Sequence, residues 1–331
     1  MIGLLLVLLA CTAGAFEADR ARLEADVRAL AGADEVDLGN GPEVMISRHI
    51  HHPDHEIARA WVKAAMEKIP GAKVWEEPFE AEGRDVANIV ADLPGSNPLA
   101  PVILLGAHFD STASLESGWD PENDPAPGAD DDASGIAAIL ELGRMLAATP
   151  RVHGVRLVAF DAEEEGLLGS KHHAKNLDRP VRLMYSLDPI GYNPGSAGYL
   201  WVTFDARWPD DGADLEALGA GGPLAVTVLD AALIGGDRRS DHAPFWDEGV
   251  PALHLASFPQ PPTYHTTEDD LANVDFDFLA DVTSLVGEHT LAAAGTPKPR
   301  DASCASAPPA TWWAVALLIC GWRRPRERER E

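Results

Sequence analysis

The sequence PGADDDASG spans residues 127–135 and lies between two apolar runs, VILLGA at 102–107 and VRLVAF at 155–160. Apolar runs of this length, bounded by loops, are typical of buried β-strands. Residues 135–148 carry apolar side chains at helical spacing. The segment therefore predicts a strand, a loop with three adjacent carboxylates, a helix and a second strand. Strands that alternate with helices in this way indicate a mainly parallel sheet.

The three adjacent aspartates, Asp130 to Asp132, stand out because ionised neighbours repel one another and are costly to bury without partners. One interpretation is a solvent-exposed loop, which is typical of charge runs. A second is that Asp132 or Ser134 caps the helix that begins at Gly135. A third is a cation site, which requires ligands from elsewhere in the chain.

The alternation of strands and helices extends through most of the chain. It predicts one α/β domain over residues 16–301, with a mainly parallel, twisted central sheet and helices on both faces. Further strands are predicted at residues 74–81, 88–93, 183–187, 199–204 and 252–256, and further helices at 16–32, 57–70, from 167, at 224–234 and at 276–294.

The chain is strongly acidic. Its 331 residues include 53 Asp and Glu against 26 Lys and Arg, a formal net charge of -27. This charge disfavours nucleic acid and anionic membrane surfaces as partners and favours cationic ligands, including the ammonium group of a peptide N-terminus. The three cysteines, Cys11, Cys304 and Cys320, all lie in the end segments. The body of the chain therefore has no thiol nucleophile, disulfide or thiolate metal site.

Both ends have the composition of targeting segments. Residues 1–15, MIGLLLVLLACTAGA, resemble a secretory signal peptide, and the sequence up to Cys11 also resembles a lipid-attachment site. Residues 302–331 combine a linker, a short hydrophobic segment and an Arg-rich end, the order found in bacterial sorting tails. We expect a secreted, periplasmic or cell-surface protein, with a membrane tether through the tail or through lipidated Cys11.

Histidines and carboxylates follow the ends of the predicted strands. Ligands of open α/β sheets bind outside the carboxyl ends of the strands, so we expect these side chains to converge on one crevice. Two histidines and four carboxylates without cysteine suit zinc or a similar divalent ion. The residues concerned are His108, Asp130, Glu163, Glu164, Asp188 and His265.

Six motifs, in this order, resemble the bimetallic zinc aminopeptidases, family twenty-eight of the metallopeptidases. The motifs are GAHFDS, PGADDDASG, FDAEEEGLLGS, SLDPIGY, SDHAPF and YHTTED. The resemblance implies a three-layer fold, two zinc ions per chain and peptide substrates with a free N-terminus.

Ligand roles also follow from the resemblance. It implies that Asp130 bridges both zinc ions, that His108 and Asp188 complete one site, and that Glu164 and His265 complete the other.

The resemblance further implies that Glu163 is the general base and that Asp110 accepts the ring N–H of His108. Asp131 and Asp241 are placed close to the metals. A cis peptide bond is implied between Asp130 and Asp131.

The C-terminal stretch GVPALHLASFPQPPTYHTTEDD is similar to animal-type glutaminyl cyclases, which share this fold and use one zinc ion. Two hypotheses therefore stand: an aminopeptidase and a glutaminyl-peptide cyclotransferase. Three features favour the aminopeptidase: Asp131 after Asp130, the absence of a Trp-bearing insertion after Glu164, and Tyr264 rather than Trp before His265. A receptor-like protein without enzymatic activity is disfavoured because all six ligand and base positions are filled.

Overall fold

The central sheet of the computed structural model contains eight strands in the order β3-β4-β6-β5-β7-β10-β8-β9. The pairs β6–β5, β5–β7, β7–β10 and β8–β9 are parallel, whereas β3–β4, β4–β6 and β10–β8 are antiparallel. The structure describes residues 16–195 and 198–297. The strands are β1 (Val36–Asp37), β2 (Pro42–Glu43), β3 (Lys73–Ala81), β4 (Arg84–Leu93), β5 (Val102–His108), β6 (Val155–Phe160), β7 (Val181–Leu187), β8 (Gly198–Phe204), β9 (Leu224–Asp230) and β10 (Ala252–Ser257).

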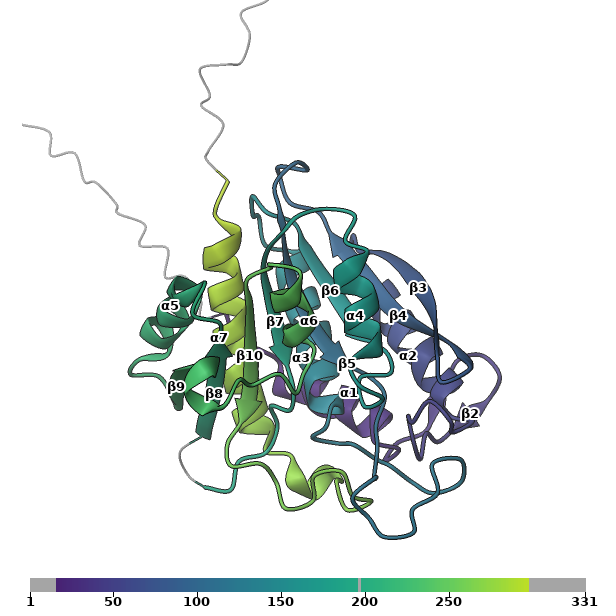
Figure 1. The fold of residues 1–331 in the computed structure, drawn as a ribbon. Coiled ribbons are helices and arrows are strands. Elements are labelled where there is room, and N and C mark those ends of the chain that lie inside the picture. The colour runs from purple at the N-terminus through teal and green to yellow at the C-terminus, as the bar shows by residue number, and fades with distance from the viewer. Residues whose placement is uncertain (1–15, 196–197, 298–331) are drawn as a thin grey trace, which may run out of the picture. The chain divides into compact units, whose positions relative to one another are not determined.

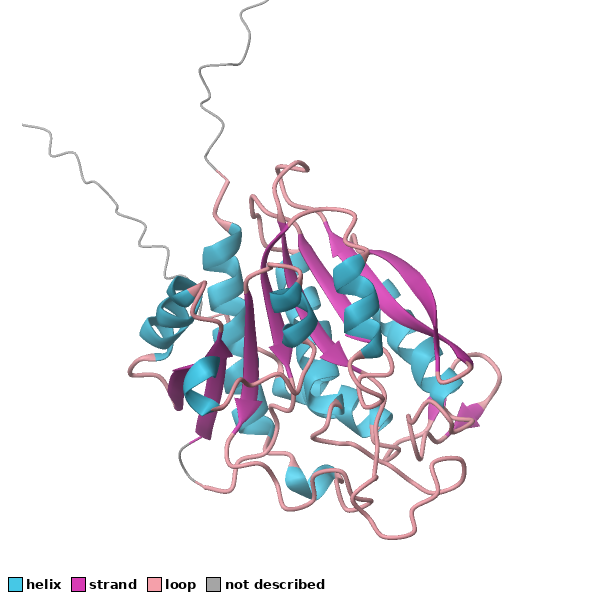
Figure 2. Ribbon diagram, in the orientation of Figure 1, coloured by secondary structure: helices cyan, strands magenta, loops and turns pink. Residues whose placement is uncertain are grey.

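Helices cover both faces of the sheet (Figures 1 and 2). Helices α1, α3 and α7 pack together on one face, with α2 beside them over β3 and β4, while α4 and α6 pack on the other face. The helices are α1 (Arg20–Leu30), α2 (His55–Glu67), α3 (Ala133–Ala147), α4 (Leu168–Lys175), α5 (Pro209–Gly219), α6 (His242–Asp247) and α7 (Phe276–Ala294), with short 3-10 turns η1 (Ala231–Ile234) and η2 (Leu271–Asn273). The predicted mixed α/β fold with a mostly parallel sheet is confirmed.

The central strands β5 and β6 are apolar except for His108 and Arg156, because both of their faces are covered. Every residue of β5 and β6 is buried. On one face of the sheet, the larger cluster of buried apolar side chains lies between these strands and α1, α3 and α7. On the other face, a smaller cluster lies between the strands and α4 and α6. This arrangement explains why the strands read as mostly apolar runs rather than as an alternating pattern.

The prediction of a helix over residues 224–234 was wrong. Residues 224–230 form β9, which pairs in parallel with β8 at the edge of the sheet, and only residues 231–234 turn into η1. The segment LAVTVLD is rich in β-branched residues, which pack well on a pleated surface. Helices α5 and α6 were not predicted.

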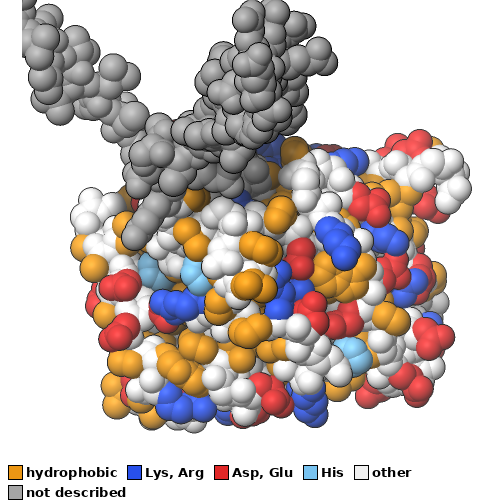
Figure 3. All heavy atoms as spheres, turned by 90° about the horizontal axis from the view of Figure 1, so that it is seen from above, with side chains coloured by type: hydrophobic (Ala, Val, Ile, Leu, Met, Phe, Trp, Pro, Cys, Tyr) orange, Lys and Arg blue, Asp and Glu red, His pale blue; other side chains and the backbone are white. Residues whose placement is uncertain are grey.

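Acidic and basic side chains are interspersed on the part of the surface that Figure 3 shows uncovered, so the net negative charge does not gather there into one patch. Within the described ranges, no helix combines the length and the apolar character that crossing a membrane requires. The predicted signal peptide, lipid-attachment site and C-terminal tail lie outside the described residues.

Candidate metal centre

Strands β5, β6, β7 and β10 run parallel, so their carboxyl ends lie on the same side of the sheet. In the view of Figure 1 these ends point downward. His108 is the last residue of β5, and Asp188 directly follows β7. Glu163 and Glu164 lie in the turn after β6, and His265 lies in the loop after β10. Because the strands are parallel, these five side chains come from segments distant in sequence to one edge.

Asp131 lies at the centre of this group. Its Oδ1 is 3.1 Å from Nε2 of His108, and its Oδ2 is 3.1 Å from Nε2 of His265. His108 Nε2 also lies 3.5 Å from Asp188 Oδ1, and His265 Nε2 lies 3.1 Å from Glu164 Oε2. One carboxylate is therefore shared by two groups, each containing a histidine and a further acid.

The placement of Asp130 at this centre was wrong by one residue. Asp130 is fully buried, and its Oδ1 instead accepts the backbone N–H of Gly191 at 2.7 Å. Within the acidic run, the cis peptide bond joins Asp131 to Asp132, one position later than expected. In a run of three aspartates, the sequence does not indicate which one faces both histidines, because all three side chains have the same chemistry.

Asp132 caps helix α3, as the second interpretation of the acidic run proposed. Its Oδ1 accepts the N–H of Gly135 at 2.9 Å, and its Oδ2 accepts the N–H of His108 at 3.1 Å. Both oxygens are thus engaged with backbone, although Asp132 also lies within 4.8 Å of donor atoms of His108 and Asp188. Asp131 therefore suits a shared ligand better than Asp132.

The donor set fits divalent metal ions. Two ligand atoms on one tetrahedral zinc ion, each about 2.1 Å from the metal, are about 3.4 Å apart. The four contacts above, at 3.1 to 3.5 Å, match that spacing. Oε1 of Glu164 is buried without a hydrogen-bond partner among the described residues. Such an orphaned carboxylate oxygen is costly in a protein unless a cation or a proton satisfies it.

The centre concentrates negative charge in a buried place. Burial, reinforced by the charge of Asp131, raises the pKa of Glu164 to about 7. Burial lowers the pKa of His265, but its contacts with Asp131 and Glu164 outweigh that effect and raise the pKa to about 10. The metal-free centre would therefore hold protons near neutral pH at positions that cations can take instead.

Glu163 is buried beside the two ligand groups, and none of the four short contacts described above includes it. It lies within 4.8 Å of donor atoms of His108 and Glu164. Burial raises the pKa of its carboxyl group well above the ordinary value, against the opposing charge of His108. A carboxylate with a raised pKa beside a metal centre suits proton transfer near neutral pH.

Asp110 orients the turn that carries the two glutamates. Its Oδ1 and Oδ2 accept the backbone N–H groups of Glu163 and Glu164, each at 3.0 Å. The ring Nδ1 of His108 contacts the backbone oxygen of Asp110 at 3.1 Å, whereas the Asp110 carboxylate is 3.5 Å away. The expected partner of the ring N–H is thus the right residue, but the better-placed acceptor is its carbonyl.

Asp241 lies at the first turn of α6 and is completely buried. Burial raises its pKa to about 7, opposed by the charge of His108 and reinforced by that of Asp188. The charges of His108 and Asp188 thus act on this carboxyl group, and a role for Asp241 beside the metals stays a prediction.

Asp269 was not assigned a role from the sequence. Its Oδ1 accepts the N–H of Asp130 at 3.1 Å, and its Oδ2 accepts the N–H of Asp131 at 3.0 Å. The Asp269 carboxylate therefore fixes the backbone at Asp130 and Asp131 through two hydrogen bonds. The only sequence signal was its position at the end of the YHTTED motif.

His254 and Asp237 hold the segment that carries Asp188. His254 Nε2 is 2.8 Å from the backbone oxygen of Asp188, and His254 Nδ1 is 2.7 Å from Asp237 Oδ2. Both ring nitrogens are therefore occupied. This pair was missed because an apolar strand with one histidine reads as core, and His254 is indeed buried.

Comparisons with known proteins find a matching family and individual relatives. The model of peptidase family M28 matches residues 88–290. Protein YfbL of Escherichia coli, described as uncharacterized, is 34% identical over 242 residues, which are 64% of this chain and 72% of that protein. Aminopeptidase YwaD of Bacillus subtilis is 28% identical over 56% of this chain, but the matched part is only 39% of that longer protein.

The fold also matches solved structures. The glutaminyl cyclase of Bacteroides thetaiotaomicron superposes with a TM-score of 0.66 over 83% of this chain and 98% of that one, at 20% sequence identity. At that identity the match concerns the fold alone.

Proposed function

Because the chain belongs to peptidase family M28, as its motifs indicated, we propose that it is a zinc-dependent aminopeptidase that removes N-terminal residues from peptides. The observation that carries the proposal is the position of Asp131, whose two oxygens each face a different histidine at 3.1 Å. A carboxylate shared in this way supports two metal sites, the first with His108 and Asp188 and the second with His265 and Glu164. We propose one zinc ion at each.

Zinc held by these residues would supply Lewis-acid polarisation of the scissile carbonyl and a more acidic water molecule. Glu163 would accept a proton from the attacking water and deliver it to the nitrogen of the leaving amine. Asp110 holds Glu163 in place through its backbone N–H. The buried acids of the centre favour the ammonium group of the substrate N-terminus by charge.

The alternative is a glutaminyl-peptide cyclotransferase with a single zinc ion, since a cyclase shares the fold. A single ion would leave one of the two acid–histidine groups around Asp131 without a cation. The presence of two such groups therefore favours hydrolysis. The two reactions are separated by product analysis: an N-terminal glutamine peptide yields free glutamine from an aminopeptidase and a pyroglutamyl peptide from a cyclase.

The decisive experiment compares Glu163→Gln with Glu164→Gln. Glu163→Gln removes the proton acceptor but no ligand, so kcat on leucine anilide should fall at least about 100-fold while zinc content is unchanged. Glu164→Gln replaces a ligand by a poorer one, so zinc content should fall and excess zinc should restore part of the activity.

Two outcomes would contradict the proposal. If both variants lost the same amount of zinc and responded equally to added zinc, the assignment of base and ligand would be wrong. If Glu163→Gln kept near-normal turnover, the hydrolytic mechanism itself would fail.

We also propose that the enzyme acts outside the cytoplasm, because the composition of residues 1–15 resembles a secretory signal peptide. A membrane tether through Cys11 or through residues 302–331 belongs to the same proposal. Fractionation of cells expressing the full chain, with N-terminal sequencing of the product, tests both.

A further inference from the structure

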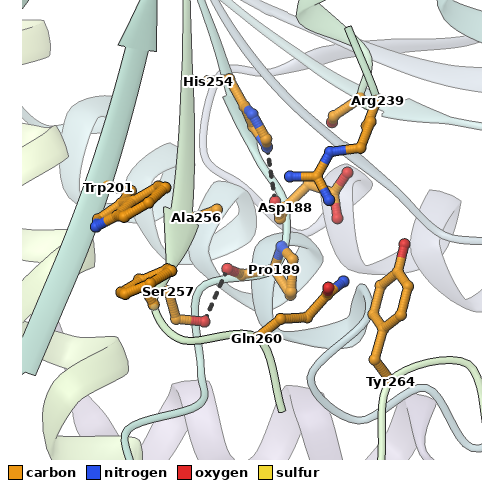
Figure 4. Close-up of a pocket in the computed structure, with 11 residues that line it drawn as sticks. Asp188, Pro189, Trp201, Arg239, His254, Ala256, Ser257, Gln260 and Tyr264 are labelled. Atoms are coloured by element: carbon orange, nitrogen blue, oxygen red, sulfur yellow. Dashed lines mark hydrogen bonds between the residues drawn. The ribbon is translucent and has the colours of Figure 1, made fainter. Parts of the chain in front are cut away.

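A cavity of about 230 Å³ opens beside the metal centre (Figure 4). Two of its lining residues connect it to the centre: Asp188, a proposed zinc ligand, and Tyr264, which directly precedes the ligand His265. The volume is below the 300–1,000 Å³ that is typical of sites for drug-sized ligands. It suits a single side chain of a substrate whose scissile bond lies at the metals.

The two sides of the cavity differ in chemistry. On one side, the rings of Trp201 and Phe258 stack with centroids 3.8 Å apart and form a flat apolar wall. On the opposite side, Figure 4 shows the guanidinium of Arg239 and the ring of Tyr264, with the amide of Gln260 between the two sides. The cavity therefore offers apolar surface for methylene groups and polar groups for the end of a side chain.

Arg239 is the one lysine or arginine among the described residues that line the cavity. Its Nε is 3.4 Å from Asp237 Oδ1, and neither of its terminal nitrogens donates a hydrogen bond to a described residue. The other oxygen of Asp237 is already engaged, since it accepts from Thr203 at 2.9 Å and contacts His254. The outer edge of the guanidinium, which pairs with carboxylates in a planar fork, is thus available.

The neighbouring arginine shows a different arrangement. Arg238 Nη2 pairs with Asp247 Oδ2 at 2.6 Å, and Arg238 does not line the cavity. Arg48, Arg84 and Arg151 also lack a carboxylate on their terminal nitrogens, but those nitrogens donate to backbone oxygens. Among the arginines of the described residues, only Arg239 has terminal nitrogens that donate no hydrogen bond. Its position at the cavity therefore points to an acidic ligand.

We propose that this cavity binds the side chain of an N-terminal aspartate or glutamate, with the carboxylate on Arg239 and the methylene groups against Trp201 and Phe258. The inference rests on the proposed aminopeptidase function, because it uses the metal centre to place the scissile bond. It names the substrate class: peptides with an acidic first residue. A lysine or arginine side chain would be repelled by the guanidinium.

The test compares anilides of glutamate, leucine and lysine on the zinc-loaded enzyme. For Arg239→Ala, we expect the ratio of kcat/KM for glutamate over leucine to fall at least about tenfold, and Arg239→Lys should retain most of the ratio. Arg239→Glu should invert the order of glutamate and lysine. Arg238→Glu is the matched control, because it makes the same charge change one residue away, and it should not invert that order.

An unchanged ratio in Arg239→Ala, or the same inversion in Arg238→Glu, would overturn the inference. A second measurement needs no turnover: calorimetric titration of the zinc-loaded protein with free glutamate and free leucine. These ligands share their ammonium and carboxylate groups, so tighter binding of glutamate that is lost in Arg239→Ala supports the inference, and equal binding refutes it. If no anilide is hydrolysed, the proposed function fails, while the titration still decides what the cavity binds.

Discussion

The substitution Asp131→Asn, which exchanges one carboxylate oxygen for nitrogen, directly tests whether Asp131 is the ligand shared by the two metal sites. In Asp131→Asn, one of the two histidine groups loses its shared carboxylate oxygen, because an amide nitrogen is not a zinc donor. Each proposed site has three protein ligands, so one of them falls to two. Residues that only orient a ligand cost about 10- to 100-fold in metal affinity when mutated. Loss of a ligand itself should cost at least about 100-fold, which corresponds to about 2.7 kcal/mol.

The matched control is Asp130→Asn. The Oδ1 of Asp130 accepts the N–H of Gly191 at 2.7 Å, and an asparagine oxygen can accept the same bond. Burial raises the pKa of Asp130 well above its ordinary value, which favours the neutral form that asparagine resembles. We expect Asp130→Asn to keep its zinc.

The assay is zinc content by mass spectrometry after dialysis against a zinc buffer, together with leucine anilide turnover. Asp131→Asn should retain about one zinc ion fewer than the parent, and its kcat should fall at least about 100-fold. Circular dichroism checks that each variant is folded. If Asp130→Asn lost zinc and Asp131→Asn kept it, the shared ligand would be Asp130 and the geometric argument would be refuted.

Two further predictions follow from the surroundings of the centre. Asp269→Asn removes one of the two oxygens that hold the N–H groups of Asp130 and Asp131, so zinc affinity should fall about 10- to 100-fold in a competition titration with a chelator, and unchanged affinity would exclude this role of Asp269. The metal-free protein should lose stability as the pH rises from about 4.5 to 7. Burial and the charge of Asp131 raise the pKa of Glu164 from 4.5 to about 7 in the folded state, which therefore binds a proton that the unfolded chain releases. His265 acts in the same direction: burial opposes its protonation, but Asp131 and Glu164 raise its pKa to about 10, and the stability it contributes below pH 6.5 is lost as the pH rises. The Tm of the chelator-treated protein should fall across this range and that of the zinc-loaded protein should fall less, whereas a rise in the metal-free Tm would contradict the assignment.

Most of the fold could be predicted because buried parallel strands have a distinct pattern. The strands β5, β6, β7 and β10 are mostly apolar rather than alternating, since helices cover both of their faces. Strand β9 lies at the edge of the sheet, where its side chains are only partly buried and the apolar signal is weaker. A short segment with that pattern does not distinguish a strand from a helix by periodicity alone.

The sequence by itself determined which residue types follow each strand, and parallel strands necessarily bring them to one edge of the sheet. It also showed a site rich in oxygen and imidazole donors without thiolates. Only the tertiary structure decided that Asp131, rather than Asp130, faces both histidines. The reason is that three adjacent identical side chains differ only in direction, and that direction depends on the local backbone and on contacts with distant residues such as Gly191 and Asp269. The position of Arg239 at the cavity was likewise decided by the packing of loops that are far apart in the sequence.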